Sequence, residues 1–563
     1  MAKIKRLNVR NLVPLVHFLF SFFYDRWVFD YSLSDAVITA QPMNEIVSLK
    51  TEKVFGFICV KLFGFLFILF LWRIIWYVWE NRKKGYIIFL SLLAFLVAAI
   101  SLLIYPFIID SVWDANVTYS YAICFLPEYW HSAYTSLVYG GMLTVFPSPA
   151  ILSPLQTVLG FGAIGYLYDR IEKSPVLKGK GRFLTIIFCL LPCSFTLFTD
   201  MYRTQQYSIL VIFFLSLVVM DIIDHRKRKN IEVVLILILA GFVSVWRTEG
   251  IILAGISIFA VIVSTYGDGL KNKALLFFTY LVITLVIMLP QKIGDMKYYG
   301  KDYQFINSFP TVYNILNDSN HNMSYYGVEE DLEGLDKLVP LNLLKAYGMD
   351  GYRRYNYANG RADINQSMAG SDVQDEYLSA YKSLVIHNVP IFLKTQGTMF
   401  LASLGYLEEP YTAEYTETEV SDYPKWYFVG WDNGRRDILN RKYTNLWNIN
   451  IVRQKMLRAF LTVREFIEKG LNTILFTPII LTALLLCLLG MFIYGIILFL
   501  KRKKYSLMLL TFSILAQLLG IFLVMPDDNI YYLYPSICGI VVLLVAFLGM
   551  ILKGKDDCKE LGT

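Results

Sequence analysis

Charged residues are scarce in this chain of 563 residues: they make up 17% of the sequence, compared with roughly 25% in an average soluble domain. Apolar residues make up 56% and aromatic residues 16%. A soluble protein could not bury that much apolar surface, so an ordinary cytosolic enzyme is excluded, and the same composition excludes a disordered chain. Membrane spans of about 20 residues each account for such a sequence.

Several motifs that indicate other functions are missing. The seven cysteines form no visible disulfide framework, and Cys189 and Cys193 read as small core residues rather than metal ligands. The first apolar run carries His17, Asp25 and Arg26 and lacks a small-residue cleavage site, which argues against a signal peptide. There is no G-x-x-x-x-G-K loop and no G-x-G-x-x-G after a strand. No internal repeat is apparent, which weakens a transporter built from inverted halves.

The apolar runs predict an all-α polytopic membrane protein with about 11–12 transmembrane helices. The run 12–29 is short and charged. The strong runs are 54–79, 86–109, 137–168, 183–199, 208–224, 232–246, 250–266, 273–290, 472–500, 506–525 and 530–552. Pro147, Pro149 and Pro154 break the run 137–168 into an interfacial helix and one span.

Positive charge is distributed unevenly among the connections. The connections between apolar runs fall into two sets, one for each side of the membrane. One set holds 25 Lys and Arg residues, whereas the short connections of the other set hold 4. By the positive-inside rule, the first set faces the cytoplasm. Both termini are then inside if 12–29 crosses the membrane, and the N-terminus is outside if it does not. The net charge of +7 therefore reflects topology rather than nucleic-acid binding.

Three regions follow from this topology. Residues 1–290 form an N-terminal transmembrane module whose outer loop 110–136 is the catalytic candidate. Residues 291–470 form an extracytoplasmic α or α+β domain with an interfacial or re-entrant helix near 389–404. Residues 471–563 form C-terminal transmembrane helices and a short cytoplasmic tail.

The outer loop 110–136 contains no Lys or Arg. Asp110 and Asp114 are spaced i, i+4, so a helix here would present both carboxylates on one face. Two close carboxylates raise the pKa of one of them and leave a base poised to take a proton from a hydroxyl. The alternative is structural: a helix cap and a solvated acid.

Arg247 and Glu249 lie in a very short outer connection, which places them at or just below the membrane interface. An Arg at that depth binds a phosphate bidentately, with little water to compete. The alternatives are an Arg247–Glu249 pair or snorkelling to headgroups. Arg203 lies in the preceding outer loop, and the alternative to a binding role is that it is simply an exposed loop residue. Tyr531 and Tyr532 lie at the start of the final span, where the alternative to a binding role is an aromatic belt at the membrane interface.

The order of these residues resembles that of bacterial polytopic glycosyltransferases of the GT-C superfamily. The matching positions are Asp114, His131, Leu155-Gln156, Asp200 to Arg203, and Arg247-Thr248-Glu249-Gly250. The resemblance covers about 86–290 and, more loosely, 373–404 and 525–540. Ser132 stands where relatives usually have Pro, and Tyr532-Leu533-Tyr534-Pro535 lacks the Arg of the family pattern.

The resemblance implies a sugar donor linked to polyprenyl phosphate and a glycan or lipid acceptor outside the cytoplasmic membrane, where the active site would lie. Asp114 would be the general base for an inverting in-line attack, with Asp110 beside it. His131 would orient the base or bind the sugar phosphate. Some members use a divalent cation, Mg²⁺ or Mn²⁺, which Asp110 and Asp114 would hold.

The resemblance also implies a phosphate site, in which Arg247 and Arg203 would bind the donor phosphate and Glu249 would hold Arg247. Aromatic residues of the same loops are candidate sugar or acceptor contacts: Trp130, Tyr202, Tyr531 and Tyr532. Membrane lipids are the other expected partner, and nucleic acid is not expected.

Three rival functions stay open. A polysaccharide polymerase or ligase with a lipid-diphosphate donor would use Arg353, Arg354 and His387 of the large outer segment. A transporter or lipid-linked oligosaccharide flippase would place charges near mid-membrane, as Lys61 does. A scaffold subunit would tolerate alanine at Asp114 and Arg247.

Overall fold

The computed structural model describes residues 2–31, 50–104, 118–119, 121–129, 132–148, 151–175, 177, 203–267, 269–298, 308–338, 340–342, 371–404, 406, 476–502, 505–525 and 530–560. Every regular element within these residues is helical, and they contain no strand. The expectation of an all-helical membrane protein is confirmed at this level, since the long apolar runs fold as helices rather than as sheet.

Five helices are long and apolar enough to cross a membrane. They are α2 (Lys50–Glu80), α9 (Arg203–Ile223), α12 (Leu270–Tyr298), α22 (Phe476–Arg502) and α23 (Ser506–Val524). Shorter apolar stretches lie in α3 (Gly85–Ile104), α10 (Asn230–Trp246), α11 (Gly250–Ser264) and α24 (Tyr534–Glu560). The run 183–199 lies outside the described residues.

Two further apolar runs of the sequence are also helical. The first is α1 (Ala2–Tyr24), which contains Pro14 and leads into the short helix η1 (Asp25–Trp27). The second is the run 137–168, which the structure divides into α5 (Ala133–Val145) and α6 (Leu152–Lys173). The break falls beside the prolines, as expected for residues that cannot donate a helical hydrogen bond.

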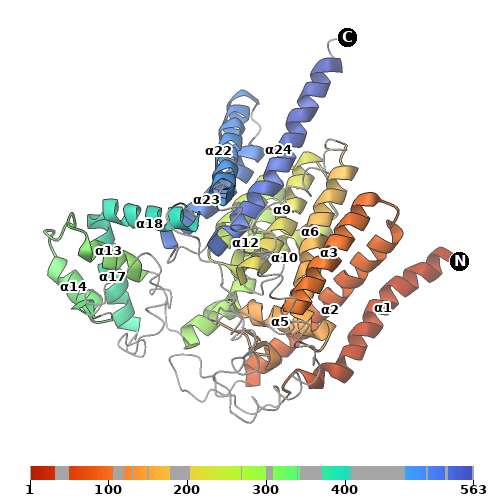
Figure 1. The fold of residues 1–563 in the computed structure, drawn as a ribbon, viewed down its shortest axis with the longest axis horizontal. Coiled ribbons are helices and arrows are strands. Elements are labelled where there is room, and N and C mark those ends of the chain that lie inside the picture. The colour runs from red at the N-terminus through yellow and green to blue at the C-terminus, as the bar shows by residue number, and fades with distance from the viewer. Residues whose placement is uncertain are drawn as a thin grey trace.

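The helices lie side by side in a bundle, with α1 at one edge (Figure 1). Glycines allow a close approach between α2 and α5. A Cβ atom at Gly140 would stand 2.6 Å from the Val60 side chain, and one at Gly64 would stand 2.6 Å from Thr144. Because lipid tails are as apolar as the helices, such close packing supplies much of the association energy between spans.

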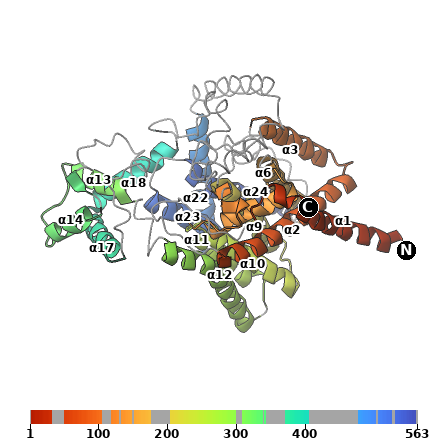
Figure 2. The same ribbon diagram turned by 90° about the horizontal axis from the view of Figure 1, so that it is seen from below.

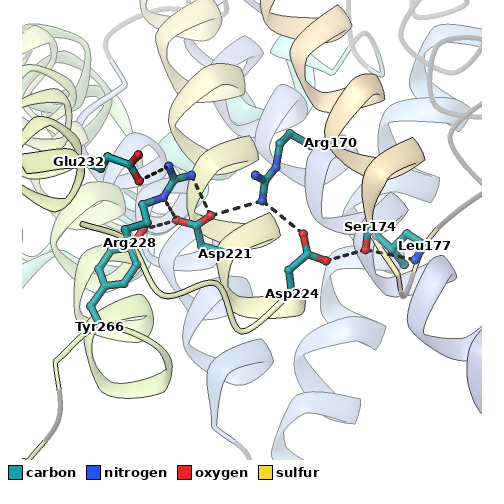
Figure 3. Close-up of polar contacts among 8 residues, drawn as sticks. All are labelled: Arg170, Ser174, Leu177, Asp221, Asp224, Arg228, Glu232 and Tyr266. Carbon is teal, nitrogen blue, oxygen red and sulfur yellow. Dashed lines mark hydrogen bonds and ion pairs between the residues drawn. The ribbon is translucent and has the colours of Figure 1, made fainter. Parts of the chain in front are cut away.

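A buried ion-pair network joins α6, α9, α10 and α11 at one end of the bundle (Figure 3). Asp221 of α9 is fully buried and accepts hydrogen bonds from Arg228 (2.9 Å), Arg170 (3.4 Å) and the hydroxyl of Tyr266. Arg170 also donates to Asp224 at 3.2 Å. We call this end the basic end, because the connections that carry most of the Lys and Arg residues meet there.

Further contacts place other connections at the same end. The Lys273 ammonium and the Tyr505 hydroxyl both donate to the backbone oxygen of Val263, which brings the starts of α12 and α23 to the end of α11. The Tyr77 hydroxyl of α2 donates to Asp169 of α6. The structure thus gathers at one end the connections that the positive-inside rule assigns to one side of the membrane.

A second buried pair ties α1 to α2. Lys61 and Asp25 form an ion pair, and both side chains are buried. The Lys61 ammonium also lies over the rings of Phe22 (4.7 Å) and Phe29 (5.2 Å). Phe29 in turn stacks on Phe125 at 4.6 Å. The pair therefore holds the aromatic cluster against which the segment 121–129 packs.

Four helices form a smaller unit beside the bundle, with an apolar core of its own (Figure 2). They are α13 (Phe309–Asn317), α14 (Val328–Asp336), α17 (Ser371–His387) and α18 (Val389–Ser403). Helix α18 runs across the direction of the spans (Figure 1) and packs on α23 through Phe400 and Phe522 at 5.9 Å.

Asp221→Ala is expected to lower the free energy of unfolding by about 3–5 kcal/mol, because it leaves two largely buried guanidinium groups without their shared carboxylate. The control is Lys173→Gln, which breaks only the exposed pair of Lys173 with Asp169 and should lower it by less than about 1 kcal/mol. Thermal unfolding of the purified protein in detergent measures both. Equal shifts for the two variants would contradict a stabilising role for the network.

Lys61→Met alone is expected to be strongly destabilising, by about 3–5 kcal/mol, because it leaves the Asp25 carboxylate buried without its cation. The double variant Lys61→Met with Asp25→Leu should recover most of that loss, since both charges are removed together. The measurement is a double-mutant cycle on unfolding temperature. A double variant as unstable as the sum of the two single variants would argue against the pair.

Candidate site at the junction of α9, α10 and α11

The site is built on the tight junction between α10 and α11. Helix α10 ends at Trp246, Arg247 is extended, and α11 begins at Gly250. Gly250 is required by the close approach of the two helices, because a Cβ atom there would stand 2.1 Å from the backbone oxygen of Val243 and 2.8 Å from the Tyr207 hydroxyl. The junction therefore fixes the backbone from which Arg247 and Glu249 project.

Arg247 is buried among groups from its own junction and from two other parts of the chain. Its exposed fraction is 8%, and that of Glu249 is 6%. The guanidinium forms an ion pair with Glu249 and donates a hydrogen bond to the hydroxyl of Thr204 at the start of α9. Its central carbon lies 5.2 Å from the centre of the Tyr532 ring. We call Arg203, Thr204, Arg247, Glu249 and Tyr532 the arginine site.

Arg203 joins the site through its backbone. It is the first residue of α9, and its carbonyl oxygen accepts a hydrogen bond of 3.2 Å from the Trp246 indole. Residues 203–204 are thus held directly beside residues 246–247.

The end of the loop 110–136 lies against the same junction. The Ser132 hydroxyl donates a long hydrogen bond of 3.5 Å to the backbone oxygen of Val245, two residues before Arg247. The amide of Gln291 in α12 bridges the segment: its oxygen accepts from the N–H of Ala133 at 2.6 Å, and its nitrogen donates to the oxygen of Tyr129 at 2.8 Å. Two helices, α10 and α12, thus hold the chain on either side of His131.

Half of the site residues expected from the sequence fall outside the described residues. These are Asp110, Asp114, Trp130, His131 and Tyr202. Their roles stay predictions.

Of the expected site residues that the structure describes, all but Tyr531 lie together. Arg203, Arg247, Glu249 and Tyr532 meet in the arginine site. The Arg247–Glu249 pair, one of the alternatives for these residues, is present, and a role in phosphate binding stays a prediction. Tyr531 is buried and packs on Tyr534 at 5.2 Å, so it faces protein rather than forming an aromatic belt.

Sequence reasoning did not single out Thr204, Gln205 and Gln206. All three are buried at the start of α9. The one available signal was a run of neutral hydrogen-bonding residues at the head of an apolar run, a pattern that also suits a solvated helix end.

The described residues of this site offer no set of ligands for a divalent cation. The described part of the chain contains no group of three His, Cys, Asp or Glu residues that could hold a metal ion. The expected ligands Asp110 and Asp114 lie outside it, so no step of the chemistry is assigned to a metal.

Comparison with known proteins returns no match: no family model, no curated protein and no solved structure is similar to this chain.

Gly250→Ala is expected to displace the turn that carries Arg247, because the added methyl group overlaps the backbone of α10. Overpacking of this kind costs about 1–3 kcal/mol, which should appear as a lower unfolding temperature. Gly255→Ala is the matched control on the same helix, since a Cβ atom there meets nothing closer than the Tyr280 hydroxyl at 3.7 Å. Equal unfolding temperatures for the two variants would contradict the close approach at Gly250.

Proposed function

We propose that this protein is an integral-membrane glycosyltransferase of the GT-C type. It moves a sugar from a polyprenyl-phosphate carrier to a glycan or lipid acceptor outside the cytoplasm, with inversion at the anomeric carbon. One observation carries the proposal: a buried arginine at the end of the spans opposite the basic end. It is surrounded by residues from α9, from the α10–α11 junction and from the short helix η6 (Ile530–Tyr532), which precedes α24.

The arginine site suits the phosphate of a lipid carrier. A guanidinium near the membrane surface is shielded from water, so its attraction for a phosphate is stronger there than in solution. Glu249 and Thr204 hold the Arg247 guanidinium in place before the reaction. A preorganised cation stabilises the leaving phosphate as its negative charge grows.

The resemblance implies that Asp114 is the general base, and one contact supports a role for its loop at the arginine site. Asp114 would take the proton of the acceptor hydroxyl while the acceptor oxygen bonds to the anomeric carbon and the bond to the carrier phosphate breaks. Ser132, next in the chain after His131, contacts Val245, two residues before Arg247. This contact places residue 132 beside the arginine site, which supports a role there for the loop that leads to it.

The side of the membrane follows from the charges. The positive-inside rule assigns the basic end to the cytoplasm, so the arginine site at the other end would face outward. Nucleotide sugars and ATP are not normally available there, and the activated sugar must arrive on a lipid. This topology favours 11–12 spans in the whole chain, including the runs outside the described residues.

The rival functions have less support from the described residues. For the polymerase or ligase, Arg353 and Arg354 lie outside them, while His387 stacks on Tyr325 at 3.8 Å and contacts the Ser383 oxygen in the small helical unit. For the transporter, the mid-membrane Lys61 is already paired with Asp25.

The test is an incubation of the purified protein in lipid with a panel of polyprenyl-phosphate sugars, with donor consumption followed by mass spectrometry. Asp114→Asn should lower the rate about 10²–10⁴-fold, the usual contribution of a positioned base. Arg247→Lys keeps the charge but loses the planar fork, and it should lower the rate on the order of 10²-fold.

Lys173→Gln, at the basic end, is the control and should leave the rate unchanged. Wild-type protein that consumes none of these donors would overturn the proposed function. Full activity of Asp114→Asn would remove Asp114 from the mechanism.

A further inference from the structure

The first turn of α9 holds an unusual concentration of buried polar atoms without hydrogen bonds. Gln205 is fully buried (0% exposed) and Gln206 is 7% exposed. Within the described part of the chain, neither the nitrogen nor the oxygen of either amide has a hydrogen-bond partner, and the same holds for Nε of Arg203. Five such atoms therefore lie within four consecutive residues.

Buried polar atoms in native proteins almost always have partners, because an unsatisfied one costs about 1–3 kcal/mol. A nearby glutamine shows the usual situation. Gln517 of α23 is equally buried, but its amide donates to the Tyr207 hydroxyl at 3.2 Å and accepts from Ser536 at 3.3 Å. Gln205 and Gln206 are therefore left to be completed by water or by a polar group that binds to the protein.

These atoms belong to the arginine site by position. Thr204, between Arg203 and Gln205, accepts the hydrogen bond of Arg247, and Arg203 accepts that of Trp246. Arg203 and Gln206 are spaced i, i+3, so they lie on the same face of α9. A ligand whose phosphate contacts Arg247 would therefore have its next groups within reach of this turn.

The chemistry of the atoms narrows the class of ligand. Each amide offers a donor NH₂ and an acceptor oxygen. A phosphate that is fully ionised only accepts hydrogen bonds, so it leaves both amide oxygens unsatisfied, and a lipid tail satisfies none of the atoms. Sugar hydroxyls donate and accept at once, and neighbouring hydroxyls on a ring match the paired donor and acceptor of an amide.

We propose that Gln205 and Gln206 bind the hydroxyl groups of the donor sugar, while Arg247 contacts the phosphate that carries it. This inference rests on the proposed function and deepens it: the two glutamines distinguish a sugar-loaded carrier from the bare lipid phosphate. They are specificity-determining residues, separate from the base and the phosphate cation.

The test compares Gln205→Leu and Gln206→Leu with Gln517→Leu in the full-length protein. Two quantities are measured: the unfolding temperature without ligand, and the affinity for polyprenyl phosphate with and without an attached hexose or pentose. Leucine removes the unsatisfied amide without adding a polar group, so the first two variants should unfold at or above the wild-type temperature. Gln517→Leu should unfold at a lower temperature, because it breaks two existing hydrogen bonds.

In the binding assay, each of the two α9 variants should bind the sugar-loaded lipid about tenfold more weakly and the sugar-free lipid phosphate as tightly as wild type. Unchanged affinity for the loaded lipid would mean that water forms the missing hydrogen bonds of the two amides. That result would overturn the sugar site but not the proposed function. Equal loss for both lipids, or lower unfolding temperatures without ligand, would also overturn it. Wild-type protein that binds no sugar-loaded lipid would overturn the proposed function as well.

Discussion

The pairing of the buried Arg247 is the interaction on which the arginine site depends. A buried guanidinium is unfavourable unless it is paired and hydrogen-bonded. Glu249 supplies the charge and Thr204 the acceptor, and both are possible because Gly250 lets α10 and α11 meet without a side chain between them. The junction converts a three-residue connection into a fixed polar site between apolar helices.

The two ends of the bundle use charge in different ways. At the basic end, Asp221 joins Arg228 and Arg170 in a network that is internally satisfied and holds α6, α9 and α10 together. At the arginine site, the Arg247–Glu249 pair lies beside amides that the described part of the chain leaves unsatisfied. The first arrangement suits a structural clamp, and the second suits a place where a polar ligand completes the protein.

The sequence predicted the helical class and the break near Pro147, and it offered the pairing of Arg247 with Glu249 as one alternative for these residues. Each of these depends on local composition or short spacing. It did not predict the Asp25–Lys61 pair or the contact of Asp221 with Arg170, whose partners lie 36 and 51 residues apart, respectively. Such contacts depend on which helices become neighbours. Gln205 and Gln206 were missed for another reason: only the tertiary structure shows that their amides are buried without partners.

The proposed activity and the proposed sugar site share one geometric requirement, namely that the carrier phosphate binds at the α10–α11 junction with its sugar toward the first turn of α9. An experimental structure of the protein with a polyprenyl-phosphate sugar bound tests this most directly. The account predicts the phosphate within about 3 Å of the Arg247 guanidinium, and the Asp114 carboxylate facing the anomeric carbon. A carrier bound elsewhere, or Asp114 on the opposite side of the bundle from Arg247, would contradict it.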